Sequence, residues 1–199
     1  MSIQKPSFER EQQWQEAIRR HIQQSKEERW HVETDIVETV VVLQELGITT
    51  PSASIGVLKH PPYAPWVRIY RTDLDEEEKR VWQVWEEAQK QNELKQLPQD
   101  EIHRLFAQYH KMRAMLISKH LQERSILLKH LIIFYERRQV PYDRILILRD
   151  MQYSAILESE GAQFQLQASA QERQQKLVEY QQELRQFTEF LKQIYFSVL

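Results

Sequence analysis

Two short patterns in the sequence have the spacing of metal ligands. Glu28 and His31 form a Glu-x-x-His pattern, and residues 100–103, Asp-Glu-Ile-His, are an imperfect second copy. On a helix this spacing puts a carboxylate and an imidazole on one face, as in di-iron helical bundles. Such a site also needs an inward-facing Glu from each of two further helices, whereas Glu28 and His31 fall where the apolar stripe of their own stretch is interrupted. We therefore interpret the pattern as a solvated helix face and predict no metal site.

Four of the seven histidines, His103, His110, His120 and His130, lie in one long stretch of helical periodicity. His103 and His110 share a helix face, but at 1.5 Å per residue they stand about 10 Å apart, whereas a metal–nitrogen bond is about 2 Å. The other two point elsewhere around the helix. We expect surface or hydrogen-bonded histidines, and we predict no catalytic residues because no nucleophile motif accompanies them.

The scarcity of glycine and cysteine excludes several chemistries. Gly47, Gly56 and Gly161 are the three glycines and stand far apart, whereas a phosphate-binding or dinucleotide-binding loop needs glycines clustered within a few residues. The absence of cysteine excludes thiol nucleophiles, thiolate zinc sites, iron–sulfur ligation and disulfides. The sequence therefore favours a protein that is not an enzyme and that uses no cofactor.

A basic segment between His103 and Arg149 raises the possibility of nucleic-acid binding. It contains ten Lys or Arg residues and three acidic ones, whereas the whole chain has a net charge of −2. Such asymmetry is typical of surfaces that bind phosphate backbones. On a helical projection, however, the basic residues fall on two flanks of an apolar stripe, where they could instead pair with the acidic segment 73–87 or with an acidic partner. The candidate nucleic-acid-binding residues are Lys111, Arg113, Arg124, Arg137 and Arg138.

Four aromatic residues are candidates for binding a protein partner. Tyr63 and Trp66 lie in a proline-stiffened segment, and Trp82 and Trp85 lie close together in a stretch of helical periodicity. Exposed Tyr and Trp anchor interfaces well because they offer a large contact area at a small entropic cost. The alternative for the first pair is that the segment folds back over a pair of helices and buries both rings.

The elements that must position these residues are mainly helical. The spacing of apolar residues predicts helices over 7–46, 73–96, 98–139 and 170–197. The first is interrupted near Ser25, where either the helix breaks or its middle turns project into solvent. Ser169 and Glu172 form a capping box before the last helix, in which apolar residues recur at alternating steps of three and four.

The rest of the chain predicts a small antiparallel sheet. Residues 48–71 form a Pro-rich loop or hairpin, in which 66–71 is rich in aromatic and β-branched residues and 55–60 is its expected partner. A second β segment is expected over 144–168, because 145–148 is an apolar run and 162–168 alternates apolar and polar residues with period two. We therefore expect these two regions to contribute to one sheet.

Together these patterns predict a single mainly α domain (α+β) over residues 1–199, a long-helix bundle or coiled coil with a small antiparallel β-sheet. The heptads of the last helix need a partner, either the N-terminal helix or a second copy in a homodimer. No apolar run reaches the ~20 residues of a membrane span, and the polar N-terminus lacks a signal peptide's apolar core, so we expect no membrane association and a cytoplasmic location.

The function that the sequence favours is a non-catalytic cytoplasmic scaffold or adaptor. It would bind a protein partner through helix faces and the aromatic Pro-rich loop. The alternative is a nucleic-acid-associated regulatory protein that uses residues 104–149. A helical-bundle metalloenzyme is the third hypothesis. The sequence does not identify the partner or the oligomeric state.

Overall fold

The computed structural model describes residues 8–27, 34–58, 63–95 and 97–197. The helices are α1 (Phe8–Glu27), α2 (Thr34–Glu45), α3 (Asp75–Leu94), α4 (Gln99–Tyr135) and α5 (Ala170–Ser197), with short 3₁₀ helices η1 (Thr72–Leu74), η2 (Tyr142–Arg144) and η3 (Glu160–Leu166). The strands are β1 (Ser52–Ser54), β2 (Trp66–Ile69), β3 (Leu146–Met151) and β4 (Ser154–Ser159). The prediction of long helices with a small antiparallel sheet is therefore confirmed.

The four strands form one antiparallel sheet in the order β1-β2-β4-β3. Trp66 of β2 lies opposite Ser54 of β1 on one side and Glu158 of β4 on the other. Strands β3 and β4 form a hairpin whose turn contains Gln152 at a positive φ of 65°. Residues from two distant parts of the chain thus share a sheet, as the sequence predicted.

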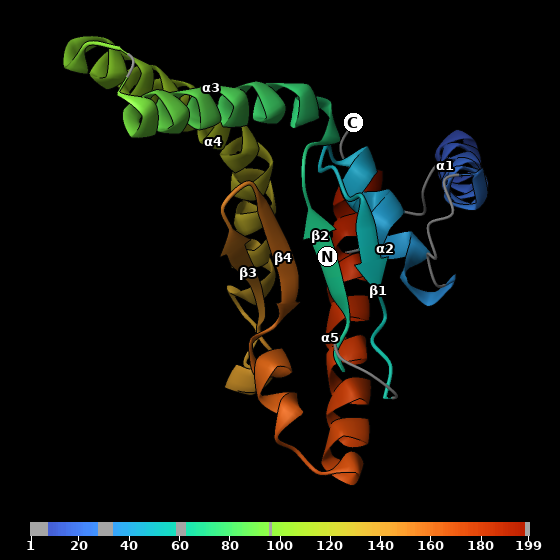
Figure 1. The fold of residues 1–199 in the computed structure, drawn as a ribbon. Helices are drawn as coiled ribbons and strands as arrows, with labels where there is room; N and C mark the ends of the chain where they lie inside the picture. The colour runs from blue at the N-terminus through green and yellow to red at the C-terminus, as the bar shows by residue number, and fades with distance from the viewer. Residues whose placement is uncertain (1–7, 28–33, 59–62, 96, 198–199) are drawn as a thin grey trace.

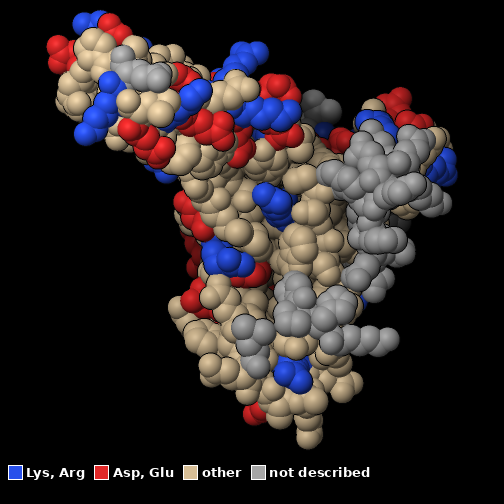
Figure 2. Space-filling view, in the orientation of Figure 1, with Lys and Arg blue, Asp and Glu red and all other residues tan. Residues whose placement is uncertain are grey.

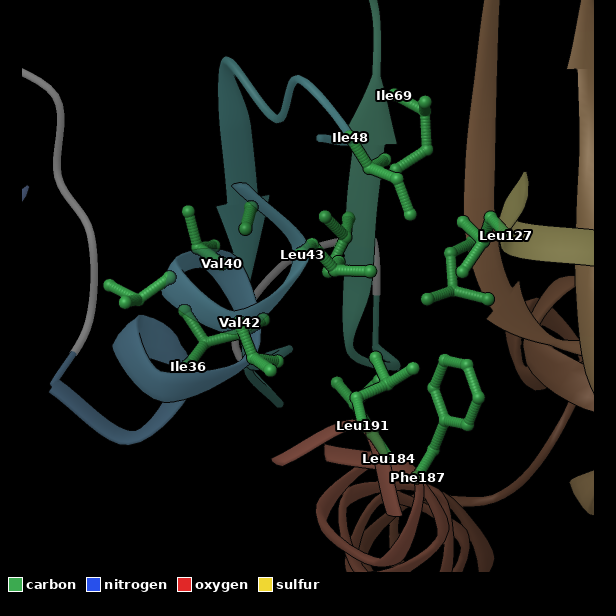
Figure 3. Packing of buried hydrophobic residues seen from close by; sticks show 14 of the residues in the cluster. Ile36, Val40, Val42, Leu43, Ile48, Ile69, Leu127, Leu184, Phe187 and Leu191 are labelled. Carbon is green, nitrogen blue, oxygen red and sulfur yellow. The ribbon is translucent and has the colours of Figure 1, made fainter. Parts of the chain in front are cut away.

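The main hydrophobic core lies between one face of this sheet and helices α2, α4 and α5 (Figures 1 and 3). Leu184, Phe187 and Leu191 of α5 are buried against α2 and the sheet. The hydroxyls of Thr39 on α2 and Thr188 on α5 lie 2.8 Å apart in this contact. The apolar stripe of the last helix therefore has its partner within the chain, in the region predicted as the N-terminal helix.

Helix α3 and the first half of α4 form an antiparallel hairpin, here called the arm, which projects from the sheet (Figure 1). A second hydrophobic cluster at its base contains Leu74, Val81, Leu116 and Tyr153. The Lys119 ammonium lies 2.6 Å from the Glu77 carboxylate. This ion pair joins a basic flank of α4 to the acidic helix α3. The sequence left open whether the basic flanks pair with the acidic segment 73–87 or with an acidic partner, and this pair is of the first kind.

Of the two alternatives for the stretch 7–46, the structure has the break: α1 and α2 are separate helices, and α1 packs beside α2 and buries Trp14 in the same core as Ile36. The join, residues 28–33, lies outside the described residues. The partner of β2 is β1 at 52–54, and not 55–60. Gly56, just after β1, has a positive φ of 79°, which takes the chain out of the extended conformation.

The strand expected at 162–168 is the 3₁₀ helix η3. In a strand whose apolar residues face the core, Phe164 would be buried and Gln165 exposed. The structure has the reverse, because Phe164 is exposed and Gln165 is buried. The segment follows β4, which already pairs with β2 and β3 on its two sides, and leads into α5. The capping box that follows is confirmed, because the Ser169 backbone N–H donates to Glu172 and the Glu172 N–H donates to the Ser169 hydroxyl.

Candidate interaction surface on helix α4

The structure does not bring the four candidate aromatic residues together. Trp66 is a half-buried residue of β2. The Arg173 guanidinium lies over the Tyr63 ring, with its Cζ 4.7 Å from the ring centroid. Trp82 and Trp85 lie on α3 of the arm and contact each other edge to face, with centroids 5.6 Å apart. Trp82 is 42% exposed. Trp66 therefore belongs to the sheet and Tyr63 contacts α5, whereas Trp82 and Trp85 form a separate aromatic contact on the arm.

Two of the five candidate basic residues are held by contacts inside the molecule. Arg124 is 7% exposed, and its guanidinium donates to the Asp150 carboxylate at 2.6 Å and to the Gln152 carbonyl at 3.0 Å. Arg138 binds Glu183 at 2.8 Å and lies over the Phe134 ring. These charges are therefore largely compensated before any phosphate approaches.

The other three basic residues lie in different surroundings. Lys111 is exposed on α4, Arg137 is exposed in the turn just after α4, and Arg113 is half-buried near Tyr153. Acidic and basic side chains are intermixed along the arm (Figure 2). The structure thus does not gather the five candidates into one site, and nucleic-acid binding stays a prediction.

The metal-ligand patterns also separate. Glu28 and His31 lie outside the described residues, and Asp100, Glu101 and His103 are exposed on the first turns of α4. Within the described ranges, no three His, Asp or Glu side chains are arranged to hold a metal ion. Over the same ranges, no helix has the length and apolar character needed to cross a membrane.

His120 corrects the expectation that the histidines are surface or hydrogen-bonded residues. It is 2% exposed and lies between the rings of Tyr70 and Tyr153, and its Nε2 has no hydrogen-bond partner among the described residues. Burial, and then the nearby Arg124 charge, lower the pKa of His120 below its usual value. The sequence held the signal, because His120 is four residues after Leu116 and seven before Leu127, on the core face of α4.

A surface that the sequence reading missed lies on the second half of α4, which runs antiparallel alongside β3. Arg124 reaches Asp150 and Gln152 at the end of β3. The Tyr135 hydroxyl accepts the Leu146 backbone N–H at 2.9 Å, at the start of β3. Eleven helical residues span about 16 Å, which matches the length of a six-residue strand. Helix α4 therefore follows β3 over its whole length.

Large aliphatic side chains on this half of α4 remain in contact with solvent, although other residues of the helix are fully buried. At roughly 100° per residue, one group lies on the side of α4 that faces β3, next to Arg124 and Tyr135. We call it the β3 margin; it comprises Leu121, Leu128 and Ile132, which are 46, 50 and 62% exposed.

A second group lies on the opposite side of the buried stripe, toward α5. This α5 margin comprises Ile126 and Ile133, which are 38 and 55% exposed. Ile133 lines a groove of about 590 Å³ between α4 and α5, together with Phe134 and Phe190. Exposed Ser125 and Lys129 form a polar ridge between the two margins.

Helical periodicity predicts a single core stripe on α4, which leaves the aliphatic residues outside that stripe without an assigned role. The signal was the pair of apolar runs 126–128 and 131–133, because three consecutive apolar residues cannot all share one face of a helix. The two margins contain no acid–base pair or metal ligand. What they offer is apolar contact area.

We compared the chain with models of protein families, with curated protein sequences and with solved structures, and no match was found in any of the three.

Proposed function

We propose that this protein is a non-catalytic scaffold or adaptor that binds a protein partner through the second half of α4. The observation that carries the proposal is the exposure of five large aliphatic side chains, between 38 and 62%, on two margins of one helix. Fully burying such a side chain is worth about 1.5–3 kcal/mol, and contiguous apolar patches on monomeric proteins often mark interaction sites.

The helical face has stronger support than the aromatic loop as the binding element. Trp66 is held in β2 between two neighbouring strands, and Tyr63 already contacts Arg173. Neither ring therefore offers its whole surface to a partner. On the arm, Trp82 presents a second exposed aromatic surface beside Trp85. The arm thus provides a further helical contact point, separate from the α4 margins.

The direct test is affinity purification from the native source with a variant that changes both margins. We expect Leu128→Glu/Ile133→Glu to abolish capture of any partner specifically recovered by the wild type, because each glutamate would need to be desolvated in the contact. The matched control is Ser118→Glu/Ser125→Glu on exposed positions of the same helix, which adds the same charges outside the margins. Quantitative mass spectrometry measures recovery, and equal recovery by all three proteins would contradict the proposal.

A further inference from the structure

Strand β3 has an outer edge at which some backbone groups point away from the sheet. The Glu160 N–H donates to the Ile145 carbonyl at 2.8 Å, which identifies this pair as hydrogen-bonded. Hydrogen-bonded pairs alternate along an antiparallel ladder, so Ile147 and Arg149 also direct their N–H and C=O groups toward β4. Leu146, Leu148 and Asp150 direct theirs outward, in agreement with the bond from the Leu146 N–H to Tyr135.

The outward groups of Leu148 and Asp150 have no neighbouring strand. Within the part of the chain that the structure describes, β3 is the end of the sheet. Residues two apart on a strand are about 6.8 Å apart, so their N–H and C=O groups repeat at the spacing that an extended chain matches. Only a strand satisfies such a row of alternating donors and acceptors with short, linear bonds.

The β3 margin of α4 lies beside this edge. Arg124 and Tyr135 contact the two ends of β3, and Leu128 and Ile132 are on the adjoining side of the helix. The sheet covers the buried stripe of α4 but ends before it covers these two side chains, which explains why they are half exposed. One added strand, about 4.8 Å from β3, would cover them and pair with the edge together.

We propose that the outer edge of β3 and the β3 margin of α4 together form a docking site for an extended segment of a partner protein, which joins the sheet as a fifth strand beside β3. This inference rests on the proposed function and specifies how the partner binds. Backbone hydrogen bonds to Leu148 and Asp150 fix the segment, and contacts with Leu128 and Ile132 select its side chains.

The surroundings specify the chemistry of the segment. Leu148 packs against the main core and Asp150 reaches Arg124 on α4, so residues paired with them also direct their side chains toward α4 and must be apolar. Arg149 is on the opposite face, 2.6 Å from Glu158 and partly exposed. Because Glu158 already compensates the charge of Arg149, the residue opposite Arg149 needs only to be polar. The segment therefore alternates apolar and polar residues.

A second copy of this chain fits the edge less well than such a segment. If two copies paired through the outward N–H and C=O groups of both residues, Leu148 of one copy would lie opposite Asp150 of the other. This register would place the two Arg149 side chains opposite each other. The arm also projects past the β3 side of the sheet, so a whole second body would have to fit beside it (Figure 1). A single strand needs only the width of one chain.

The test uses a fluorescein-labelled peptide, acetyl-Thr-Val-Glu-Val-Thr-Val-Lys-amide, and the full-length protein, with binding followed by fluorescence anisotropy. The valine N–H groups face β3 in the proposed pairing, whereas those of Glu and the central Thr face away. We expect N-methylation of the first two valines to raise Kd about tenfold or more, because two hydrogen bonds of about 1 kcal/mol are lost. N-methylation of Glu and the central Thr is the matched control and should change Kd less than twofold.

Protein variants locate the peptide on the molecule. Leu128→Glu/Ile132→Glu should raise Kd at least tenfold, whereas Ile126→Glu/Ile133→Glu on the α5 margin should leave it unchanged, with circular dichroism checking that both fold. No binding at ~1 mM peptide, or equal weakening by both methylation patterns, would overturn the inference. A dimer that Leu128→Glu/Ile132→Glu dissociates would overturn it in favour of a second copy. If partner capture still depends on the margins while the peptide fails, the proposed function stands and only the added strand is wrong.

Discussion

At the scale of single residues, the same type of residue has different roles in different surroundings. Gly47 and Gly56 both have a positive φ, 78° and 79°. A Cβ added at Gly47 would meet open space, whereas one at Gly56 would lie 2.5 Å from the backbone carbonyl carbon of Ala64. Gly47 thus serves the backbone conformation alone, and Gly56 also permits the close approach of two chain segments.

We therefore expect Gly56→Ala to destabilise the protein more than Gly47→Ala. Both variants strain the backbone by about 1–2 kcal/mol, but only Gly56→Ala forces two backbone segments apart, which adds about 1–3 kcal/mol. Urea unfolding followed by circular dichroism measures both free energies. An equal loss of unfolding free energy in the two variants would show that the close approach of Gly56 and Ala64 does not affect stability.

His120 gives the protein a pH dependence of stability. Burial lowers its pKa below the ordinary 6.5, so between that lower value and 6.5 the unfolded chain binds a proton that the folded chain does not. Stability therefore falls as the pH falls through 6.5, by at most about 1.4 kcal/mol per pH unit for this residue. His130, whose pKa is also lowered by burial, acts in the same direction.

The variant His120→Phe isolates this effect, because phenylalanine keeps a ring between Tyr70 and Tyr153 but cannot bind a proton. We expect its free energy of unfolding to change less between pH 7.5 and 5.5 than that of the wild type. Carboxyl groups with lowered pKa values, such as Asp143, contribute only at still lower pH. Urea titrations at both pH values provide the measurement, and identical pH slopes would refute the role of His120.

At the scale of elements, the arm differs from the rest of the fold in how it is stabilised. Its base is held by a small cluster around Val81 and Leu116, whereas α2, α5 and the sheet share the large core. The ion pair between Lys119 and Glu77 also joins the two helices, but a partly exposed pair adds little. The stability of the arm thus depends on few apolar contacts.

We expect Leu116→Ala to open the arm before the rest of the molecule unfolds. The substitution removes a fully buried side chain from the small cluster and costs about 2–5 kcal/mol there. Amide hydrogen exchange should rise along α3 while α5 keeps its protection. Leu191→Ala, a matched change in the large core, should instead raise exchange in α2, α5 and the sheet together. Uniform exchange in the Leu116 variant would show that the arm and body unfold as one unit.

At the scale of the whole molecule, the basic excess of the central segment is divided among internal contacts. Arg124, Arg138 and Arg149 bind Asp150, Glu183 and Glu158, respectively. The formal charge of the segment is therefore a poor guide to the charge that its surface presents.

The nucleic-acid hypothesis nevertheless makes a clear prediction through its two most exposed candidates. If Lys111 and Arg137 neutralise phosphates, Lys111→Glu/Arg137→Glu should weaken retention on immobilised duplex DNA and lower the slope of log affinity against log salt by about two. Elution in a salt gradient from ~50 mM provides the measurement. No retention of the wild type at the lowest salt would refute the hypothesis.

Local patterns identified most of the helices. The start of α5 was predicted closely because the Ser169–Glu172 capping box is a local interaction. The same reasoning failed at 162–168, because alternation alone does not make a strand: β4 already has a neighbour on each side, and the segment forms a 3₁₀ helix with Gln165 buried and Phe164 exposed. The spacing of His120 from Leu116 and Leu127 places it on the core face of α4, but the rings that it contacts, Tyr70 and Tyr153, come from two other parts of the chain and could not be read from local patterns.

For the candidate surface, the apolar runs 126–128 and 131–133 indicate aliphatic residues outside the core stripe of α4, but they do not show which of these residues stay exposed. The sequence by itself determined that the protein consists of long helices, because glycine and proline are scarce within them, and it determined which face of α5 is apolar. The tertiary structure alone decided which apolar residues stay exposed, because exposure depends on where the neighbouring element ends. Leu127 is buried and Leu128 is half exposed, although they are adjacent in the chain, because the sheet packs over one side of α4 and stops at β3.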